Sequence, residues 1–198
     1  MITYNLKELE FYEQCAKKDS QHLIDLLNKS PTIEHAYGHG LRINFIISAL
    51  KQLNENSLLD IGFGGCFFEM ALKNHFKETT GIDLTTSFCS YGKKYLDNTL
   101  RTDWVSLPFK DKAFDVCIWS EGPEHAVNCT DVFHEIKRVT KKCLITSVPD
   151  WSYLIPGHLR TFTQESFQKE LEKVFDKISV IYVKPEWLVA LCIIGENK

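Results

Sequence analysis

The sequence lacks an apolar run near the ~18 residues that a membrane-spanning helix requires, and its first residues have no apolar signal core. It also lacks a block of consecutive basic residues, and its net charge is only −3. This weak, mixed charge argues against a dominant surface for nucleic acid, although a small RNA acceptor stays open. We therefore expect a cytoplasmic protein that does not enter a membrane.

Disulfide and zinc motifs are missing as well. Seven cysteines are present, but no two form a C-x-x-C pair, and several lie inside apolar runs typical of strands. This distribution fits reduced, buried thiols better than a disulfide framework or a structural zinc site.

From Ser57 onward, short apolar runs alternate with helical patterns. The predicted strands cover Leu58–Ile61, Glu78–Ile82, Leu100–Trp104, Phe114–Trp119 and Cys143–Val148. The predicted helices between them cover Phe67–Lys73, Ser87–Leu96 and Val132–Val139. Such alternation predicts an α/β fold, with a largely parallel sheet and helices on both faces.

The two ends of the chain differ from this pattern. Residues 1–54 read as helices, interrupted by a predicted loop at Ser30–Gly40, and we expect them to form an N-terminal cap on the core at 55–198. Near the other end, Thr163 can cap a helix. The strands Ile178–Val183 and Leu188–Ile194 then follow with four residues between them, too few for a parallel crossover. They predict a final antiparallel pair in a seven-stranded mixed sheet.

A glycine-rich turn follows the first predicted strand. Asp60 precedes Gly62, Gly64 and Gly65, and a helical segment begins directly afterwards. A strand, a glycine turn and a helix in this order allow backbone N–H groups to approach a polar ligand closely.

Polar residues also end the next three predicted strands. Asp83 ends the second, Asp103-Trp104 the third and Ser120-Glu121 the fourth. Ligands of parallel sheets bind beyond these carboxyl ends, and Asp83 is placed to accept hydrogen bonds from ribose hydroxyls.

Two adenosine-containing ligands are candidates for this edge of the sheet: a dinucleotide such as NAD, and S-adenosylmethionine. A dinucleotide fingerprint requires a third glycine where this chain has Phe67, and Asp60 disfavours a pyrophosphate at the helix start. S-adenosylmethionine carries no phosphate, and its sulfonium and ammonium groups suit an anionic strand end. The residues favour the methyl donor, and an NAD-linked oxidoreductase is the rival.

Six motifs, in order, make residues 57–150 resemble the class I S-adenosylmethionine-dependent methyltransferases, in particular the type 11 small-molecule family. The motifs are Leu59-Asp60-Ile61-Gly62-Phe63-Gly64-Gly65, Gly81-Ile82-Asp83-Leu84, Ser106-Leu107-Pro108-Phe109, Phe114-Asp115-Val116, Glu121-Gly122-Pro123-Glu124-His125, and Phe133–Val139 with Ser147-Val148-Pro149. The resemblance implies a Rossmann-like core. The chain departs from the family at Cys66, where a third glycine is usual.

The resemblance also implies roles for individual residues. Asp60, Gly62 and Gly64 would lie along the methionine moiety of the cofactor, and Ser120 and Glu121 would line its end. The remaining roles concern the nucleoside: Asp83 would bind the ribose, Leu84 would pack on adenine, Asp103 would accept from the adenine amino group and Trp104 would flank it.

The residues that would act on the methyl acceptor are less clearly indicated by the sequence than those that would bind the cofactor. Methyl transfer to an O or N atom of a small molecule is an in-line displacement, and His125 is the first candidate for a general base, followed by His39 and Glu121. Glu121, Glu124 and His125 also share one turn, with His158 in the following loop. This set resembles the metal-assisted sites of some ubiquinone-pathway O-methyltransferases and small-RNA 2′-O-methyltransferases, and the sequence leaves open whether it holds a metal.

The sequence lacks the motifs of two classes of DNA methyltransferase, which narrows the range of possible acceptors. The chain has no Asn/Asp-Pro-Pro-aromatic element of exocyclic-amine DNA methyltransferases and no Pro-Cys pair of cytosine C5 enzymes. Trp151, Tyr153, Leu154 and Ile155 favour an acceptor with an apolar or aromatic part, or form a lid that packs on itself. Cys66 and Gly122-Pro123 keep a cofactor-binding protein without catalysis as an alternative, and the oligomeric state is not predicted.

Overall fold

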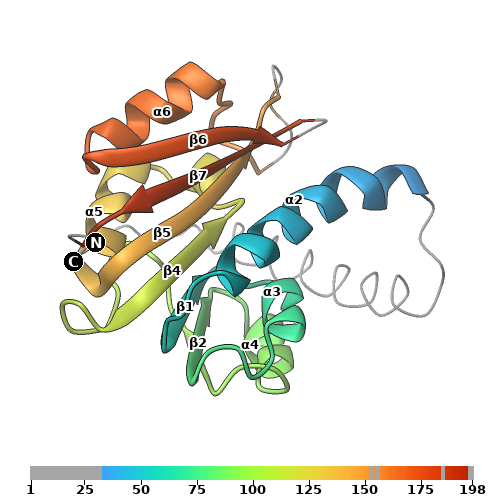
Figure 1. The fold of residues 1–198 in the computed structure, drawn as a ribbon, viewed down its shortest axis with the longest axis vertical. Helices are drawn as coiled ribbons and strands as arrows, with labels where there is room; N and C mark the ends of the chain where they lie inside the picture. Colours follow the sequence, from blue (N-terminus) through green and yellow to red (C-terminus); the bar gives the residue numbers. More distant parts are fainter. Residues whose placement is uncertain (1–32, 152–153, 155–156, 184–185, 196–198) are drawn as a thin grey trace.

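The computed structural model describes residues 33–151, 154, 157–183 and 186–195, and its centre is one sheet of seven strands (Figure 1). The order across the sheet is β3-β2-β1-β4-β5-β7-β6. The strands are β1 (Ser57–Ile61), β2 (Glu78–Asp83), β3 (Asn98–Arg101), β4 (Phe114–Ser120), β5 (Thr140–Pro149), β6 (Lys177–Val183) and β7 (Trp187–Ile193).

The strand directions confirm the predicted mixed sheet. Strands β1 to β5 are mutually parallel where they pair, and β7 runs antiparallel to both β5 and β6. Since β2 and β4 flank β1 on opposite sides, the strand order reverses direction at β1. This places the carboxyl ends of β1, β2 and β4 at one edge of the sheet, where α/β proteins bind ligands.

Helices cover both faces of the sheet. The helices are α2 (Ile33–Lys51), α3 (Phe67–Ala71), α4 (Thr86–Gly92), α5 (Cys129–Val139) and α6 (Gln164–Glu172), with a short 3₁₀ turn, η1 (Pro123–His125). One face packs on α5 and α6 around Phe133 and Phe167, and the other packs on α2 and α3 around Leu50 and Phe68. Successive residues of β1, Leu58 and Leu59, point into the two different cores, as a strand buried on both faces requires.

Several predicted boundaries were wrong. Helix α2 begins at Ile33, inside the segment Ser30–Gly40 predicted to be a loop. Glycine lowers helix propensity only modestly, so tertiary packing can outweigh it. Strand β3 covers Asn98–Arg101 and ends three residues earlier than predicted, so Asp103 and Trp104 lie in the following loop. The helix after Thr163 does form, with Thr163 and Ser166 making reciprocal capping hydrogen bonds.

The thiol prediction agrees with the structure where it can be compared. Six cysteines lie among the described residues, and all six are buried: Cys66, Cys89, Cys117, Cys129, Cys143 and Cys192. Cys15 lies outside the described residues. Within the described part of the chain, none of the helices has the length and hydropathy needed to cross a bilayer.

Asp115 ties the start of β4 to the start of β1. Its carboxylate accepts hydrogen bonds from the backbone N–H groups of Asn56 and Ser57, both at 3.1 Å, and pairs with Lys141 at 2.9 Å. In return, the backbone N–H of Asp115 donates to Ser57 Oγ. The Phe-Asp pair of the sequence motif therefore has a structural role in this chain.

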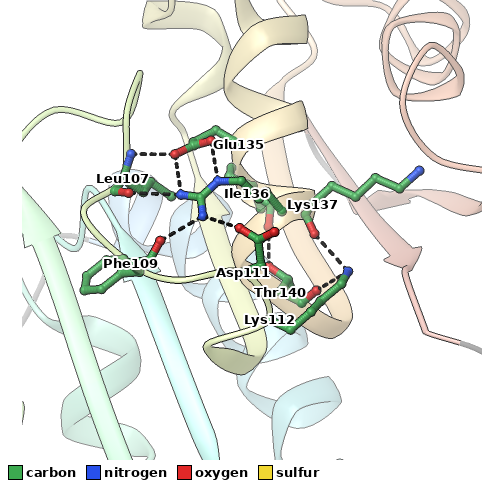
Figure 2. Close-up of polar contacts among 9 residues, drawn as sticks. Leu107, Phe109, Asp111, Lys112, Glu135, Ile136, Lys137 and Thr140 are labelled. Carbon is green, nitrogen blue, oxygen red and sulfur yellow. Dashed lines mark hydrogen bonds and ion pairs between the residues drawn. The ribbon is translucent and has the colours of Figure 1, made fainter.

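Arg138 anchors the loop between β3 and β4 onto α5. Figure 2 labels its partners Leu107, Phe109, Asp111 and Glu135. The Arg138 guanidinium donates to the carbonyl oxygens of Leu107 and Phe109 at 3.0 and 2.8 Å, and it pairs with Asp111 and Glu135. Glu135 also accepts from the backbone N–H of Leu107. The same loop carries Asp103 and Trp104, two predicted cofactor contacts, a few residues before the segment that Arg138 binds.

We expect Arg138→Lys to destabilise the protein by about 2 kcal/mol, since a lysine satisfies only part of the planar guanidinium's partners and leaves loop carbonyls unpaired. Denaturant unfolding at neutral pH measures this. Arg101→Lys is the control, because Arg101 is exposed and its guanidinium donates to the carbonyl of Leu84. Equal stabilities of the two variants would show that the Arg138 network does not support the loop.

We expect Asp115→Asn to destabilise the protein by about 1 kcal/mol at pH 7, through loss of the charged partner of Lys141. Burial raises the pKa of Asp115, but Lys141 and the backbone donors outweigh burial, so its pKa in the folded protein is lowered. The contribution is therefore present above the unfolded pKa of about 4 and is lost as the pH falls through the folded pKa.

Unfolding titrations of wild type and Asp115→Asn between pH 7 and 3 test this sign. The stability difference should shrink as the pH falls, whereas the exposed control Asp176→Asn should show no such trend. A difference that grows in acid would contradict the assignment.

Candidate active site

The glycine turn after β1 adopts three left-handed backbone conformations. Gly62, Gly64 and Cys66 have φ values of 70°, 49° and 60°. Gly62 is exposed at the carboxyl edge of the sheet, and its N–H donates to the carbonyl of Ile82 at 2.8 Å. Cys66 thus keeps the conformation that a third glycine favours, at a strain of about 1 kcal/mol for a residue with a Cβ.

Asp83 joins the turn to the end of β2. Its carboxylate accepts a hydrogen bond from the Gly64 N–H at 3.2 Å and from the backbone and hydroxyl of Thr85 at 2.8 and 3.0 Å. These donors orient the Asp83 carboxylate directly beside the glycine turn, although Gly64 and Asp83 are 19 positions apart in the sequence. Carboxylate oxygens accept more than one hydrogen bond each, so the arrangement suits a ligand with hydroxyl groups.

Asp60 lies beneath the turn beside Glu69 of α3, which the sequence patterns did not single out. The two side chains are 1% and 2% exposed, and no hydrogen-bond partner is present for Asp60 Oδ2 or for either Glu69 carboxyl oxygen. Burial, followed by the nearby Glu69 and Asp83, raises the pKa of Asp60 well above its ordinary value, and burial also raises the pKa of Glu69. A cationic ligand group near this pair would offset the cost of burying it.

The predicted adenine contacts surround the same edge. Leu84 is half-buried after β2, and Asp103 Oδ1 accepts a hydrogen bond from the Val105 N–H at 3.1 Å. The ring of Trp104 lies edge-on to Trp119 with centroids 5.7 Å apart. It is also close to Gly62, since a Cβ built on that glycine would stand 3.7 Å from the Trp104 ring.

Arg42 of α2 organises the ends of β4 and β5. It is 5% exposed, donates to the hydroxyls of Ser120 and Ser147, and pairs with Glu121 at 2.8 Å. Its guanidinium also lies 4.6 Å from the centroid of the Trp187 ring. The positive charge of Arg42 is therefore balanced by Glu121.

The backbone after β4 turns sharply at Glu121 and Gly122. Glu121 has a φ of 56°, an uncommon conformation for a non-glycine residue that is often found at functional sites. A Cβ at Gly122 would overlap the indole ring of Trp119, so only glycine fits at this position. Packing against Trp119 therefore explains the glycine of the Gly122-Pro123 pair noted in the sequence.

A second group of side chains lies just past this turn. Glu124, His125 and His158 each place a ligand atom within 4.8 Å of those of the other two. His125 Nδ1 is 2.8 Å from the carbonyl of Gly157, and its ring meets that of His158 edge-on with centroids 4.7 Å apart. Burial lowers the pKa of His125, so its imidazole is neutral near pH 7.

Some predicted contacts fall outside what the structure describes. His39 belongs to α2, but its side chain is not among the described ones, and neither Tyr153 nor Ile155 is described. Trp151 is described, and its ring stacks on His158 with centroids 5.7 Å apart. Leu154 is exposed.

The fold and the arrangement at the carboxyl edge define a class I, Rossmann-like methyltransferase architecture. Residues 59–143 match the family model described as a methyltransferase domain, type 11. This match and the fold mark residues 59–143 as a methyltransferase domain, similar to those of that family. No curated protein sequence matches the chain significantly.

Solved structures share the fold at low sequence identity. Magnesium protoporphyrin IX methyltransferase from Synechocystis PCC 6803, solved with bound SAH, is 12% identical with a TM-score of 0.66, over 83% of this chain and 88% of that one. A possible histamine N-methyltransferase from Thermotoga maritima is 17% identical with a TM-score of 0.66, over 81% and 92%. The cyclase SpnF is 13% identical with a TM-score of 0.64, over 79% and 81%, so this fold alone does not determine the reaction.

We expect Gly122→Ala to destabilise the protein by about 2 kcal/mol, because the added methyl group must displace the fully buried Trp119. Gly40→Ala is the matched control: nothing lies within 4 Å of its Cβ position in helix α2, and alanine favours a helix by about 0.5–1 kcal/mol. Thermal unfolding of both variants should show shifts of opposite sign. A neutral Gly122→Ala would contradict the packing role of this turn.

Proposed function

We propose that the protein transfers a methyl group from S-adenosylmethionine to an O or N atom of a small-molecule acceptor. The observation that carries this proposal is the Gly64–Asp83 contact. It holds a carboxylate beside an exposed, left-handed glycine turn at the point where strand order reverses. Together with the type 11 family match, this geometry favours an adenosyl ligand without a pyrophosphate.

The residues at this edge fit that cofactor. S-adenosylmethionine supplies a methyl group activated by a sulfonium cation. On our proposal, Gly62 and Gly64 allow the backbone to approach the ligand, and Asp83 binds its ribose. Burial raises the pKa of both Asp60 and Glu69, so a neighbouring ammonium or sulfonium cation would stabilise their charged forms, whereas the pyrophosphate of NAD would be disfavoured beside them.

The remaining contacts complete the cofactor site in this proposal. Leu84, Asp103 and Trp104 surround the adenine, and the loop that carries the last two is held by Arg138. Ser120 and Glu121 line the methionine end, where Arg42 orients both side chains. We also assign residues 1–54 to a cap over this edge, on the ground that Arg42 reaches the site from α2.

On the acceptor side we assign the catalytic role to His125. A carbonyl oxygen only accepts hydrogen bonds, so the contact with Gly157 places the imidazole proton on Nδ1 and the lone pair on Nε2. A neutral imidazole in this tautomer can receive the proton that an acceptor loses during methyl transfer. The closely packed Trp151 and His158 rings favour an acceptor with an apolar or aromatic part.

We expect S-adenosylhomocysteine to bind the protein at one site per chain, measured by isothermal titration calorimetry. Asp83→Asn should weaken this binding by about 10- to 100-fold, since hydrogen bonds to a charged group contribute about 1.5–3 kcal/mol. Asp131→Asn, an exposed acid on α5, should leave binding unchanged.

Thermal unfolding with S-adenosylhomocysteine and with NAD distinguishes a methyltransferase from an NAD-linked oxidoreductase. S-adenosylhomocysteine should raise the melting temperature and NAD should not. A folded wild-type protein that responds to NAD alone, or to neither ligand, would overturn the proposal. Incubation with methyl-labelled donor and a fractionated metabolite extract then separates catalysis from binding without turnover, because only a catalyst transfers the label.

A further inference from the structure

Glu124 is a charged residue placed where a charge is costly. Its side chain is 1% exposed, and neither carboxylate oxygen has a hydrogen-bond partner in the structure. An isolated carboxylate in such surroundings costs several kcal/mol unless a cation or a proton compensates it. Arg42 contributes favourable charge, but its guanidinium forms its ion pair with Glu121.

Two imidazoles converge on this carboxylate from separate segments. His125 follows Glu124 in η1, and His158 comes from the chain after β5, which is fixed to η1 by the hydrogen bond from the Leu159 N–H to the Glu124 carbonyl at 2.8 Å. The Gly157 carbonyl sets the His125 ring with Nε2 as the ligand atom, and Trp151 stacks on His158. Backbone carbonyls orient metal-bound histidines in this way.

Glu121 lies close to this group but does not belong to it. Among the described residues, the side chains close enough together to hold one metal ion are those of Glu124, His125 and His158. Glu121 instead turns toward Arg42, with 2.8 Å between Oε1 and Nη2. The structure therefore supports three protein ligands in place of the four that the sequence motif suggested.

We propose that Glu124, His125 and His158 bind one divalent first-row transition-metal ion, of the class of Mn²⁺, Fe²⁺, Co²⁺ or Zn²⁺, at the acceptor side of the site. Two imidazoles and one carboxylate match the ligand preferences of these ions, whereas Mg²⁺ prefers oxygen ligands and retains its water. Three protein ligands leave coordination positions open to a further molecule.

This inference rests on the proposed function for the role of the ion. An open position beside the methyl donor suits an acceptor hydroxyl, whose oxygen binds the ion and becomes more acidic. The new O–C bond then forms as the donor's S–C bond breaks, and the hydroxyl proton leaves to water. With the ion bound, Nε2 of His125 is a ligand, and this role replaces the general-base role that we assign to His125 for a metal-free site. The acceptor is then an alcohol or phenol, not an amine.

Titration of the chelator-treated full-length protein with Co²⁺, without cofactor or acceptor, tests the site directly. Visible absorption of bound Co²⁺ should appear and saturate at one ion per chain, and Zn²⁺ should displace it while excess Mg²⁺ should not. Glu124→Gln and His158→Ala should each weaken Co²⁺ binding by at least about ten-fold, as even substitutions outside the ligand shell do at metal sites.

His134→Ala is the matched control, because His134 is exposed on α5 and lies outside the group. Its Co²⁺ affinity should equal that of wild type. Since Glu124 is buried, circular dichroism must show that Glu124→Gln is folded; if it is not, the partly exposed His158→Ala decides the result. No Co²⁺ spectrum from folded wild type, or equal affinity in His158→Ala and His134→Ala, would overturn the inference.

Titration of the same samples with S-adenosylhomocysteine separates the two proposals. Cofactor binding without Co²⁺ uptake would overturn the metal site and leave the methyltransferase proposal standing. Co²⁺ uptake without cofactor binding would support the metal site and overturn the methyltransferase proposal.

Discussion

The position of β1 between β2 and β4 is the constraint on which the candidate site depends. Parallel strands end at the same edge, and the order of the sheet reverses at β1. The glycine turn, Asp83 and Ser120 follow three different strands, yet they meet at that edge. The Asp83 contact to Gly64 then joins the ends of β1 and β2, and the Arg42 contacts to Ser120 and Ser147 join the ends of β4 and β5.

Buried charge distinguishes this edge from the rest of the core. Asp60, Glu69 and Glu124 are all nearly inaccessible, and each has carboxyl oxygens without a partner. Stable folds seldom keep such groups for structural reasons, because apolar residues of similar volume would usually be more stable. This burial is the basis for our proposal that Asp60 and Glu69 face a cationic group of the cofactor and that Glu124 binds a metal ion.

Much of the fold could be predicted because its signals are local. Apolar runs, glycines and Thr163 mark strands, turns and a cap within a few residues, and the four-residue link before β7 required an antiparallel pair. The errors arose where local preference competes with packing. Ser30–Gly40 has turn residues, yet α2 begins at Ile33, and the exposed β3 ends before the apolar pattern around Trp104 does.

By itself, the sequence determined the strand–helix order, the glycine turn and the acids that follow β1 and β2, and hence the nature of the expected cofactor. Only the tertiary structure decided which distant side chains meet. Glu69 joins Asp60, Arg42 pairs with Glu121, and His158 approaches Glu124, because packing brings together segments whose separation along the chain has no local signature. Asp115 and Gly122 likewise acquired structural roles that depend on Lys141 and Trp119, partners that no short motif contains.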